Sequence, residues 1–159
     1  MDKLTKIKQN LAQATDGLNT PIDQGIFDLV TALNYLDFPT DSSCQGHPEQ
    51  SGAFFPWVMI ANDSKNVNFD NQGEYYKYAM TNLDLQKRFI PLLSEFYNGR
   101  KTEHQHRIFC NLIQCGMIEI MPQSGYISEF ITEKEEREKL HSIYKQEFDD
   151  FKIFLESKF

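Results

Sequence analysis

The chain has 159 residues, with 16 lysines and arginines against 23 aspartates and glutamates, so its formal net charge is −7 with histidine neutral. That length predicts one domain covering residues 1–159, and its 40% content of hydrophobic residues can fill a core without disulfides or structural metals. The ordinary contents of charged residues, glycine and proline exclude collagen, coiled-coil rods and wholly disordered chains.

Other compositional features bear on compartment and partners. No apolar run approaches the length of about 18 residues that spans a membrane, so we expect a soluble protein with no membrane partner. Three cysteines without the spacing of a small disulfide scaffold favour reduced thiols, and hence the cytoplasm of its own cell or of a host cell. The negative charge argues against broad nucleic-acid binding, because a polyanion would be repelled.

The first 36 residues predict two helices. Apolar residues at helical spacing in residues 2–14 indicate an amphipathic segment, so residues 1–18 form either a docked helix or an arm that ends near Asp16-Gly17. Thr20 as N-cap and Pro21 in the first helical position predict the start of a second helix over residues 21–36.

The middle of the chain predicts strands followed by a long helix. We expect a short strand near residues 40–44, another at 55–61 and a short partner strand at 66–69. Asn71 and Glu74 have the spacing of a capping box and predict a helix, which Pro91 should kink or divide. Asn98-Gly99 is a typical helix end.

The last third of the chain predicts two β-like segments between Arg107 and Met121, then a terminal helix. Gly116 separates the β-like segments as either a bulge or the turn of a hairpin. Thr132 and Glu135 have capping-box spacing ahead of the terminal helix. This element order lacks regular strand–helix alternation, so we expect an α+β fold with a small antiparallel or mixed sheet packed by about four helices.

The loop and strand ends within residues 40–57 hold the candidate site. The segment combines hydroxyls, a thiol, an imidazole and a permissive glycine, and function is often placed on loops held by rigid elements. The candidate ligand-binding residues are Ser42, Ser43, Cys44, Gly46, His47, Trp57 and Arg107.

The same region carries two resemblances. Ala32-Leu33-Asn34, Phe38-Pro39-Thr40, Ser43-Cys44-Gln45-Gly46-His47 and Phe55-Pro56-Trp57-Val58-Met59-Ile60 together resemble a pattern in small uncharacterised bacterial proteins. That resemblance covers about a quarter of the chain and implies no particular activity. Thr40, Ser42-Ser43-Cys44 and Gly46 are similar to the Ser-Ser-Cys-x-Gly loop of the methyltransferase family of tRNA wybutosine synthesis, but that family continues with a basic residue where this chain has His47.

Chemistry at this loop has three alternatives. In the first, Cys44 and His47 bind zinc together with His104 and His106, which would share one face of a strand. Such a site would assist hydrolysis or group transfer, with Glu49 or Glu103 as general base.

In the second alternative, Cys44 is a nucleophile activated by a neighbouring imidazole. This requires a cation or a helix N-terminus near the thiol to lower the pKa of Cys44. In the third, the Ser42-Ser43 hydroxyls and the backbone near Gly46 bind an anionic or nucleotide-like ligand, with Arg88, Arg100 or Arg107 as charge partner.

These alternatives stand beside a purely structural interpretation, in which Cys44 packs under the sheet and His47 faces solvent. Whether the protein is an enzyme stays open. The first function hypothesis is binding of a small polar or nucleotide-like ligand at the 40–57 loop. Metal-assisted hydrolysis or transfer is the second. An acidic interaction or inhibitor module with a protein or homo-oligomeric partner is the third, motivated by acidic clusters at residues 133–138 and 147–150.

Overall fold

The computed structural model describes residues 2–16, 19–50, 53–128 and 130–159. Gly17, where the sequence predicts the end of the first segment, lies outside the described residues. The helices and strands of the described part are α1 (Lys3–Ala12), α2 (Gln24–Tyr35), β1 (Thr40–Cys44), β2 (Trp57–Ile60), α3 (Gln72–Tyr97), β3 (Ile108–Leu112), β4 (Ile118–Pro122), α4 (Gly125–Ser128) and α5 (Lys134–Glu156). Short 3₁₀ turns occupy His104–His106 and Gln114–Gly116.

The four strands form one antiparallel sheet in the order β1-β2-β4-β3. Alternation along β2 buries Val58 and Ile60 completely while Trp57 and Met59 stay partly accessible. Ile118 and Ile120 of β4 lie opposite the buried pair of β2, so one face of the sheet is apolar. The predicted α+β fold is confirmed, and the sheet is antiparallel rather than mixed.

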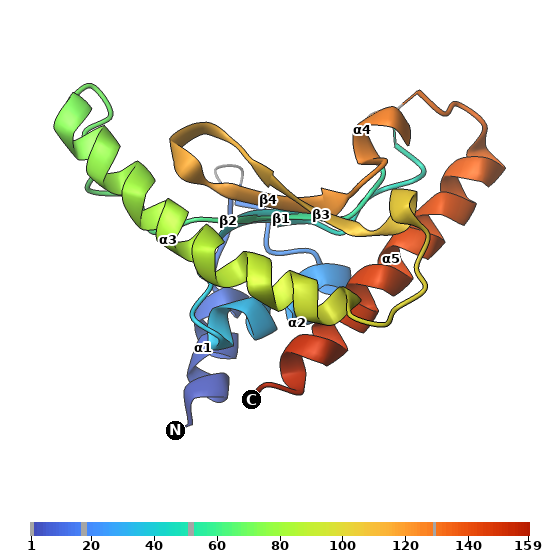
Figure 1. Cartoon of the computed structure of the whole chain (residues 1–159), viewed down its shortest axis with the longest axis horizontal. Helices are drawn as coiled ribbons and strands as arrows, with labels where there is room; N and C mark the ends of the chain where they lie inside the picture. Colours follow the sequence, from blue (N-terminus) through green and yellow to red (C-terminus); the bar gives the residue numbers. More distant parts are fainter. Residues whose placement is uncertain (1, 17–18, 51–52, 129) are drawn as a thin grey trace.

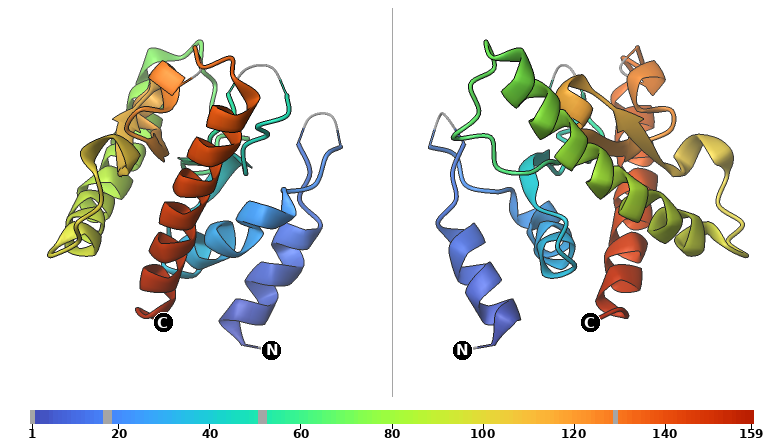
Figure 2. Two further views of the ribbon diagram at one scale, coloured as in Figure 1. Left: turned by 90° about the vertical axis from the view of Figure 1, so that its right-hand side faces the viewer. Right: turned by 60° about the vertical axis from the view of Figure 1, so that its left-hand side comes forward.

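Three helices cover the apolar face of the sheet (Figure 1). Leu33 of α2, Phe89 of α3 and Phe151 of α5 are completely buried in the shared core. The ring of Phe89 meets that of Phe151 edge-on with centroids 6.0 Å apart, which joins α3 to α5. Figure 2 shows that both chain termini lie at the same end of the molecule.

The short helix α4 has no counterpart in the sequence prediction and lies on the side of the sheet away from α2 (Figure 1). Near it, a second and smaller apolar cluster joins Phe54, Phe55, Met121 and Tyr144. This cluster anchors the chain just before β2, so the loop that carries the candidate site is fixed at both ends.

Two predicted helix starts are wrong. Thr20 and Pro21 do not begin α2, because Pro21 pairs with Thr15 in an antiparallel bridge and the helix starts at Gln24. Likewise α5 begins after Glu133 rather than after Thr132. Neither helix has a side-chain N-cap hydrogen bond. The residue types that favour capping therefore predicted the wrong first residue for both helices.

The long helix α3 follows its prediction more closely. The Asn71 side chain accepts hydrogen bonds from the backbone of Gly73 and Glu74, as an N-cap should. Pro91 lies inside the helix without dividing it. Pro91 is exposed, so water can solvate the carbonyl that loses its intrahelical partner there. Gly99 follows the C-cap with φ of +79°.

Three details of the β structure settle or correct the prediction. The segment 66–69 forms no strand, because β4 occupies the free edge of β2. Gly116 belongs to a hairpin turn, since β3 and β4 pair directly on either side of it. His104 and His106 lie in a 3₁₀ turn and not in a strand, so the expectation that they share a strand face is wrong.

The first helix docks on α2. Leu11 packs against the main core, while Lys3 and Lys8 form ion pairs with Asp37 and Asp28 at 3.0 and 3.9 Å. The described residues contain no helix with the length and apolar character needed to cross a bilayer.

Candidate functional site

A pocket of about 390 Å³ lies along the edge strand β1, between that strand and the segment that links α1 to α2. Its volume is in the range typical of small-molecule sites. Five of the seven predicted ligand-binding residues line it: Ser42, Ser43, Cys44, His47 and Trp57. Cys44 is the last residue of β1 and lies opposite Trp57, the first residue of β2.

Gly46 does not line the pocket but gives the loop its shape. Its φ is +81°, and a β-carbon there would lie 2.4 Å from the carbonyl oxygen of Phe54. The backbone N–H of Gly46 also donates to the Cys44 sulfur over 3.3 Å. Only glycine therefore lets the chain turn from β1 while passing this close to residue 54.

Arg137 of α5 holds the loop that follows. Its guanidinium donates to the carbonyl oxygens of Pro48 at 3.0 Å, Gln50 at 2.5 Å and Ile131 at 3.2 Å. It also lies 4.4 Å from the centre of the Phe54 ring, and the residue is only 8% exposed. A planar fork can serve several carbonyls at once, so this arginine fixes the loop beside the site.

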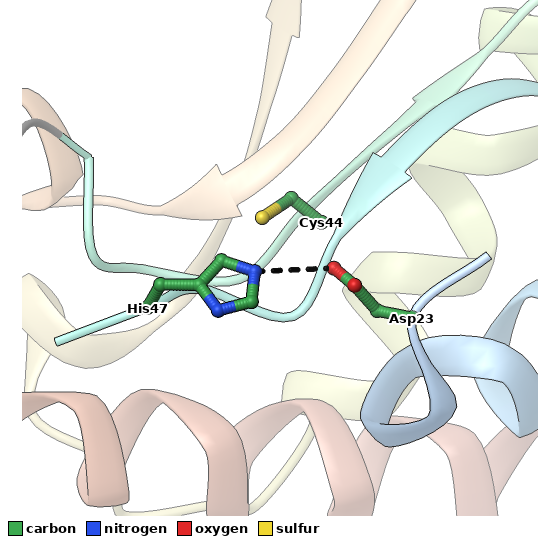
Figure 3. A group of neighbouring side chains, drawn as sticks. All are labelled: Asp23, Cys44 and His47. Atoms are coloured by element: carbon green, nitrogen blue, oxygen red, sulfur yellow. Dashed lines mark ion pairs between the residues drawn. The ribbon is translucent and has the colours of Figure 1, made fainter. Parts of the chain in front are cut away.

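Asp23, Cys44 and His47 converge at one wall of the pocket (Figure 3). The His47 Nε2 atom lies 3.5 Å from Oδ2 of Asp23, and the ligand atoms of all three residues lie within 4.8 Å of one another. The side chains of Asp23 and His47 are 25% and 28% exposed, so a small solute can reach them.

Backbone and side-chain partners orient these groups. Oδ2 of Asp23 accepts a hydrogen bond of 3.0 Å from the backbone N–H of Gln45. The second ring nitrogen of His47, Nδ1, lies 3.5 Å from a carboxylate oxygen of Glu49. His141 of α5 contacts the Gln45 carbonyl oxygen through Nε2 at 3.1 Å, which ties the same loop to α5.

The surroundings of Cys44 do not activate it as a nucleophile. Burial raises the pKa of its thiol, and the nearby Asp23 carboxylate raises it further, although the Gly46 N–H opposes them. No lysine or arginine lines the pocket in the described part of the chain. Without a metal, the protonated thiol therefore dominates at neutral pH, which does not favour the nucleophile hypothesis.

The remaining predicted partners lie elsewhere. Arg107 does not line the pocket: its Nε donates to the carbonyl oxygen of Thr102, and its guanidinium lies over the Tyr97 ring. His104 and His106 do not join the group of Cys44 and His47. His106 instead lies 6.0 Å from the ring of Tyr144.

Asp23, Arg137 and His141 are the site residues that sequence reasoning missed. In the sequence, Asp23 is an acidic residue near a predicted helix start, where such residues are common. Its position relative to its neighbours does not indicate a contact with a loop some twenty positions later. Arg137 and His141 lie on α5, about ninety residues from the loop they hold. Their spacing of four places them on one helix face, which is the only local signal available.

Comparisons with protein-family models, curated proteins and solved structures returned no match to this chain. The two resemblances noted in the sequence stay expectations.

Proposed function

We propose that this protein binds a small polar molecule carrying a positive charge in the pocket beside β1. The observation that carries the proposal is the character of the lining: it contains Asp16, Asp23 and Asp41 but no lysine or arginine among the described residues. An enclosed surface bearing one sign of charge attracts ligands of the opposite sign. This charge disfavours the phosphates of a nucleotide-like ligand.

The rest of the lining supports a ligand that also has an apolar part. Leu11, Pro21 and Ile22 are among the lining residues, and Trp57 offers an aromatic surface. An aromatic face attracts ammonium and guanidinium groups, while the apolar lining residues suit a short carbon chain. A small amine therefore matches the lining better than an anion does.

A second candidate function is hydrolysis or group transfer assisted by a metal. The grouping of Asp23, Cys44 and His47 at the wall of the same pocket favours it, because a metal held there would face a bound molecule.

The acidic clusters give less support to an interaction or inhibitor module. In the first cluster Glu138 pairs with Lys134, and Glu136 pairs with Lys139. In the second, Glu147 and Asp150 both bind Arg100, and Glu147 is 6% exposed. These acids meet cations within the chain instead of forming a uniformly negative face.

Fluorescence titration tests the proposed ligand class, because Trp57 is the sole tryptophan and lines the pocket. The probes are putrescine, its neutral counterpart butanediol, and AMP. We expect putrescine to change the Trp57 emission with saturation, and butanediol and AMP to leave it unchanged. Saturable binding of AMP without binding of putrescine would overturn the proposal.

The matched variants are Asp41→Asn, in the pocket wall, and Asp84→Asn, on the exposed surface of α3. Both raise the net charge by one, so they separate a local contact from general attraction to an acidic protein. We expect the first to weaken putrescine binding about 2-fold to 5-fold, in line with an exposed charge pair, and the second to leave it unchanged. Equal effects would mean that the pocket does not hold the cation.

A further inference from the structure

We infer that Asp23, Cys44 and His47 form a binding site for zinc or a similar divalent transition metal, with Glu49 as the residue that orients His47. The inference deepens the proposed function, since the metal would lie at the wall of the ligand pocket. It rests on three observations: the types of the donor atoms, their separations, and the partners that orient them.

The donor set is chemically specific. One thiol, one imidazole and one carboxylate oxygen together match the ligands that Zn²⁺ binds, whereas Mg²⁺ and Ca²⁺ prefer oxygen alone. The three donors come from separate places in the chain: the residue before α2, the end of β1 and the loop that follows it. Cys44 and His47 are neighbours in the chain, and the fold adds Asp23 from about twenty positions earlier.

The separations are close to those of a coordinated ion. Ligand atoms around a tetrahedral zinc, with bonds of about 2.0–2.3 Å, lie about 3.3–3.8 Å apart. The distance of 3.5 Å between His47 Nε2 and Asp23 Oδ2 falls in that range. The largest separation within the group is no more than 4.8 Å, so small side-chain rotations bring the Cys44 sulfur into position.

The orientation of His47 suits a metal ligand. In Figure 3 the imidazole presents one nitrogen to the Asp23 carboxylate and lies beside the Cys44 sulfur. Its other nitrogen, Nδ1, faces the Glu49 carboxylate at 3.5 Å. A histidine that binds a metal commonly uses its second nitrogen in this way, and such carboxylates fix the ring and raise its basicity.

Two backbone N–H groups also orient the proposed metal ligands. The N–H of Gln45 binds the Asp23 carboxylate, and the N–H of Gly46 binds the Cys44 sulfur. Both belong to the turn that Gly46 makes possible. The same turn that shapes the pocket therefore also orients two of the three ligands.

The arrangement leaves one coordination position for a small molecule. Three protein ligands with water or substrate in the fourth position are typical of catalytic zinc, while structural sites have four protein ligands. Asp23 and a Cys44 thiolate would neutralise the charge of a divalent ion, so Asp16 and Asp41 would still favour a positively charged ligand.

The test is zinc affinity of the full chain after removal of metals, measured by competition with a chromophoric chelator, and the spectrum of the Co²⁺-loaded protein. We expect one zinc ion per chain and a near-ultraviolet band from thiolate-to-cobalt charge transfer. Cys44→Ser should abolish that band, whereas Cys115→Ser, the same change in the β3–β4 turn, should keep it. His47→Ala should keep the fold, by circular dichroism, and lose zinc affinity at least 100-fold.

Glu49→Gln should weaken zinc binding about 10-fold, the lower end for a carboxylate that orients a metal-bound histidine, because the Glu49 side chain is 61% exposed. Glu135→Gln, on the exposed first turn of α5, is its control and should bind zinc as the wild type does. A wild-type protein that binds no zinc, or a cobalt complex without the thiolate band, would overturn the inference even if Cys44→Ser failed to fold.

The ligand hypothesis can fail separately from the metal site. Putrescine binding is measured on the metal-free and the zinc-loaded protein through Trp57 fluorescence. Zinc binding without putrescine binding would remove the proposed ligand class and leave the metal site. Putrescine binding without zinc binding would remove the metal site and leave the proposed ligand class.

Discussion

Gly46 is the residue on which the local shape of the site depends most. Alanine there would have to adopt a φ of +81° and place its β-carbon 2.4 Å from a backbone oxygen. The left-handed conformation costs about 1–2 kcal/mol in a non-glycine residue, and the contact with backbone adds to it. We expect Gly46→Ala to lower the free energy of unfolding by about 2–4 kcal/mol in urea denaturation.

Gly99 provides the matched control. It has nearly the same φ, +79°, but a β-carbon at this position would meet no other atom within 4 Å. Gly99→Ala should therefore show only the conformational cost, about 1–2 kcal/mol. If both substitutions cost the same, the close approach of Gly46 to residue 54 is not a constraint on the site.

At the scale of helices, side-chain caps differ in a way that can be measured. Asn71 accepts two backbone hydrogen bonds at the start of α3, whereas Thr132 lies one residue before the N-cap of α5. Asn71→Ala should lower the free energy of unfolding by about 1 kcal/mol, and Thr132→Ala should change it by less than about 0.5 kcal/mol. A larger loss for Thr132→Ala than for Asn71→Ala would contradict the observed helix starts.

The contact between α5 and the chain after α3 depends on pH. Nη2 of Arg100 binds Glu147 at 3.0 Å and Asp150 at 2.9 Å. Burial alone would raise the pKa of Asp150, but hydrogen bonds from Arg100 and Gln146 outweigh that effect, so its pKa lies below the usual 3.8. A depressed pKa means that the folded state favours the ionised carboxylate.

The ionised Asp150 carboxylate therefore stabilises the folded state at pH values above the pKa it has in the unfolded chain. This contribution is lost as the pH falls through its pKa in the folded protein. We expect Asp150→Asn to be about 1 kcal/mol less stable than the wild type between about pH 5 and pH 7, since the pair is partly exposed. That difference should shrink below the usual pKa of 3.8. The measurement is urea denaturation across this pH range, and a difference that stays constant into acid would contradict the pairing.

Local patterns predicted most elements because each pattern is set by near neighbours. The helical period before Tyr35, the β-forming run from Trp57 and the cap at Asn71 all correspond to observed elements. Where the prediction is wrong, a distant segment is responsible. The helix start predicted at Pro21 lies instead after Asp23, whose carboxylate binds the distant backbone of Gln45, and β4 excludes a strand at residues 66–69.

At the scale of the whole molecule, the position of the site could be predicted but its charge could not. Cys44, His47 and Trp57 lie within fourteen positions of one another, so a short connection already brings them together. Two of the three lining aspartates, Asp16 and Asp23, come from the segment between α1 and α2, whose placement depends on how α1 docks, and Asp41 comes from β1. For that reason the sequence favoured an arginine and an anionic ligand, whereas the fold places three aspartates and no arginine in the lining among the described residues.

The central claim is that the fold brings Asp23, Cys44 and His47 together as metal ligands at the wall of the pocket. Anomalous diffraction at the zinc edge, from crystals of the zinc-loaded full chain, tests it most directly. We predict one strong peak about 2.0–2.3 Å from His47 Nε2, Cys44 Sγ and an oxygen of Asp23, with the Glu49 carboxylate at Nδ1 of His47. No peak there, or a peak at His104 and His106 instead, would contradict the account.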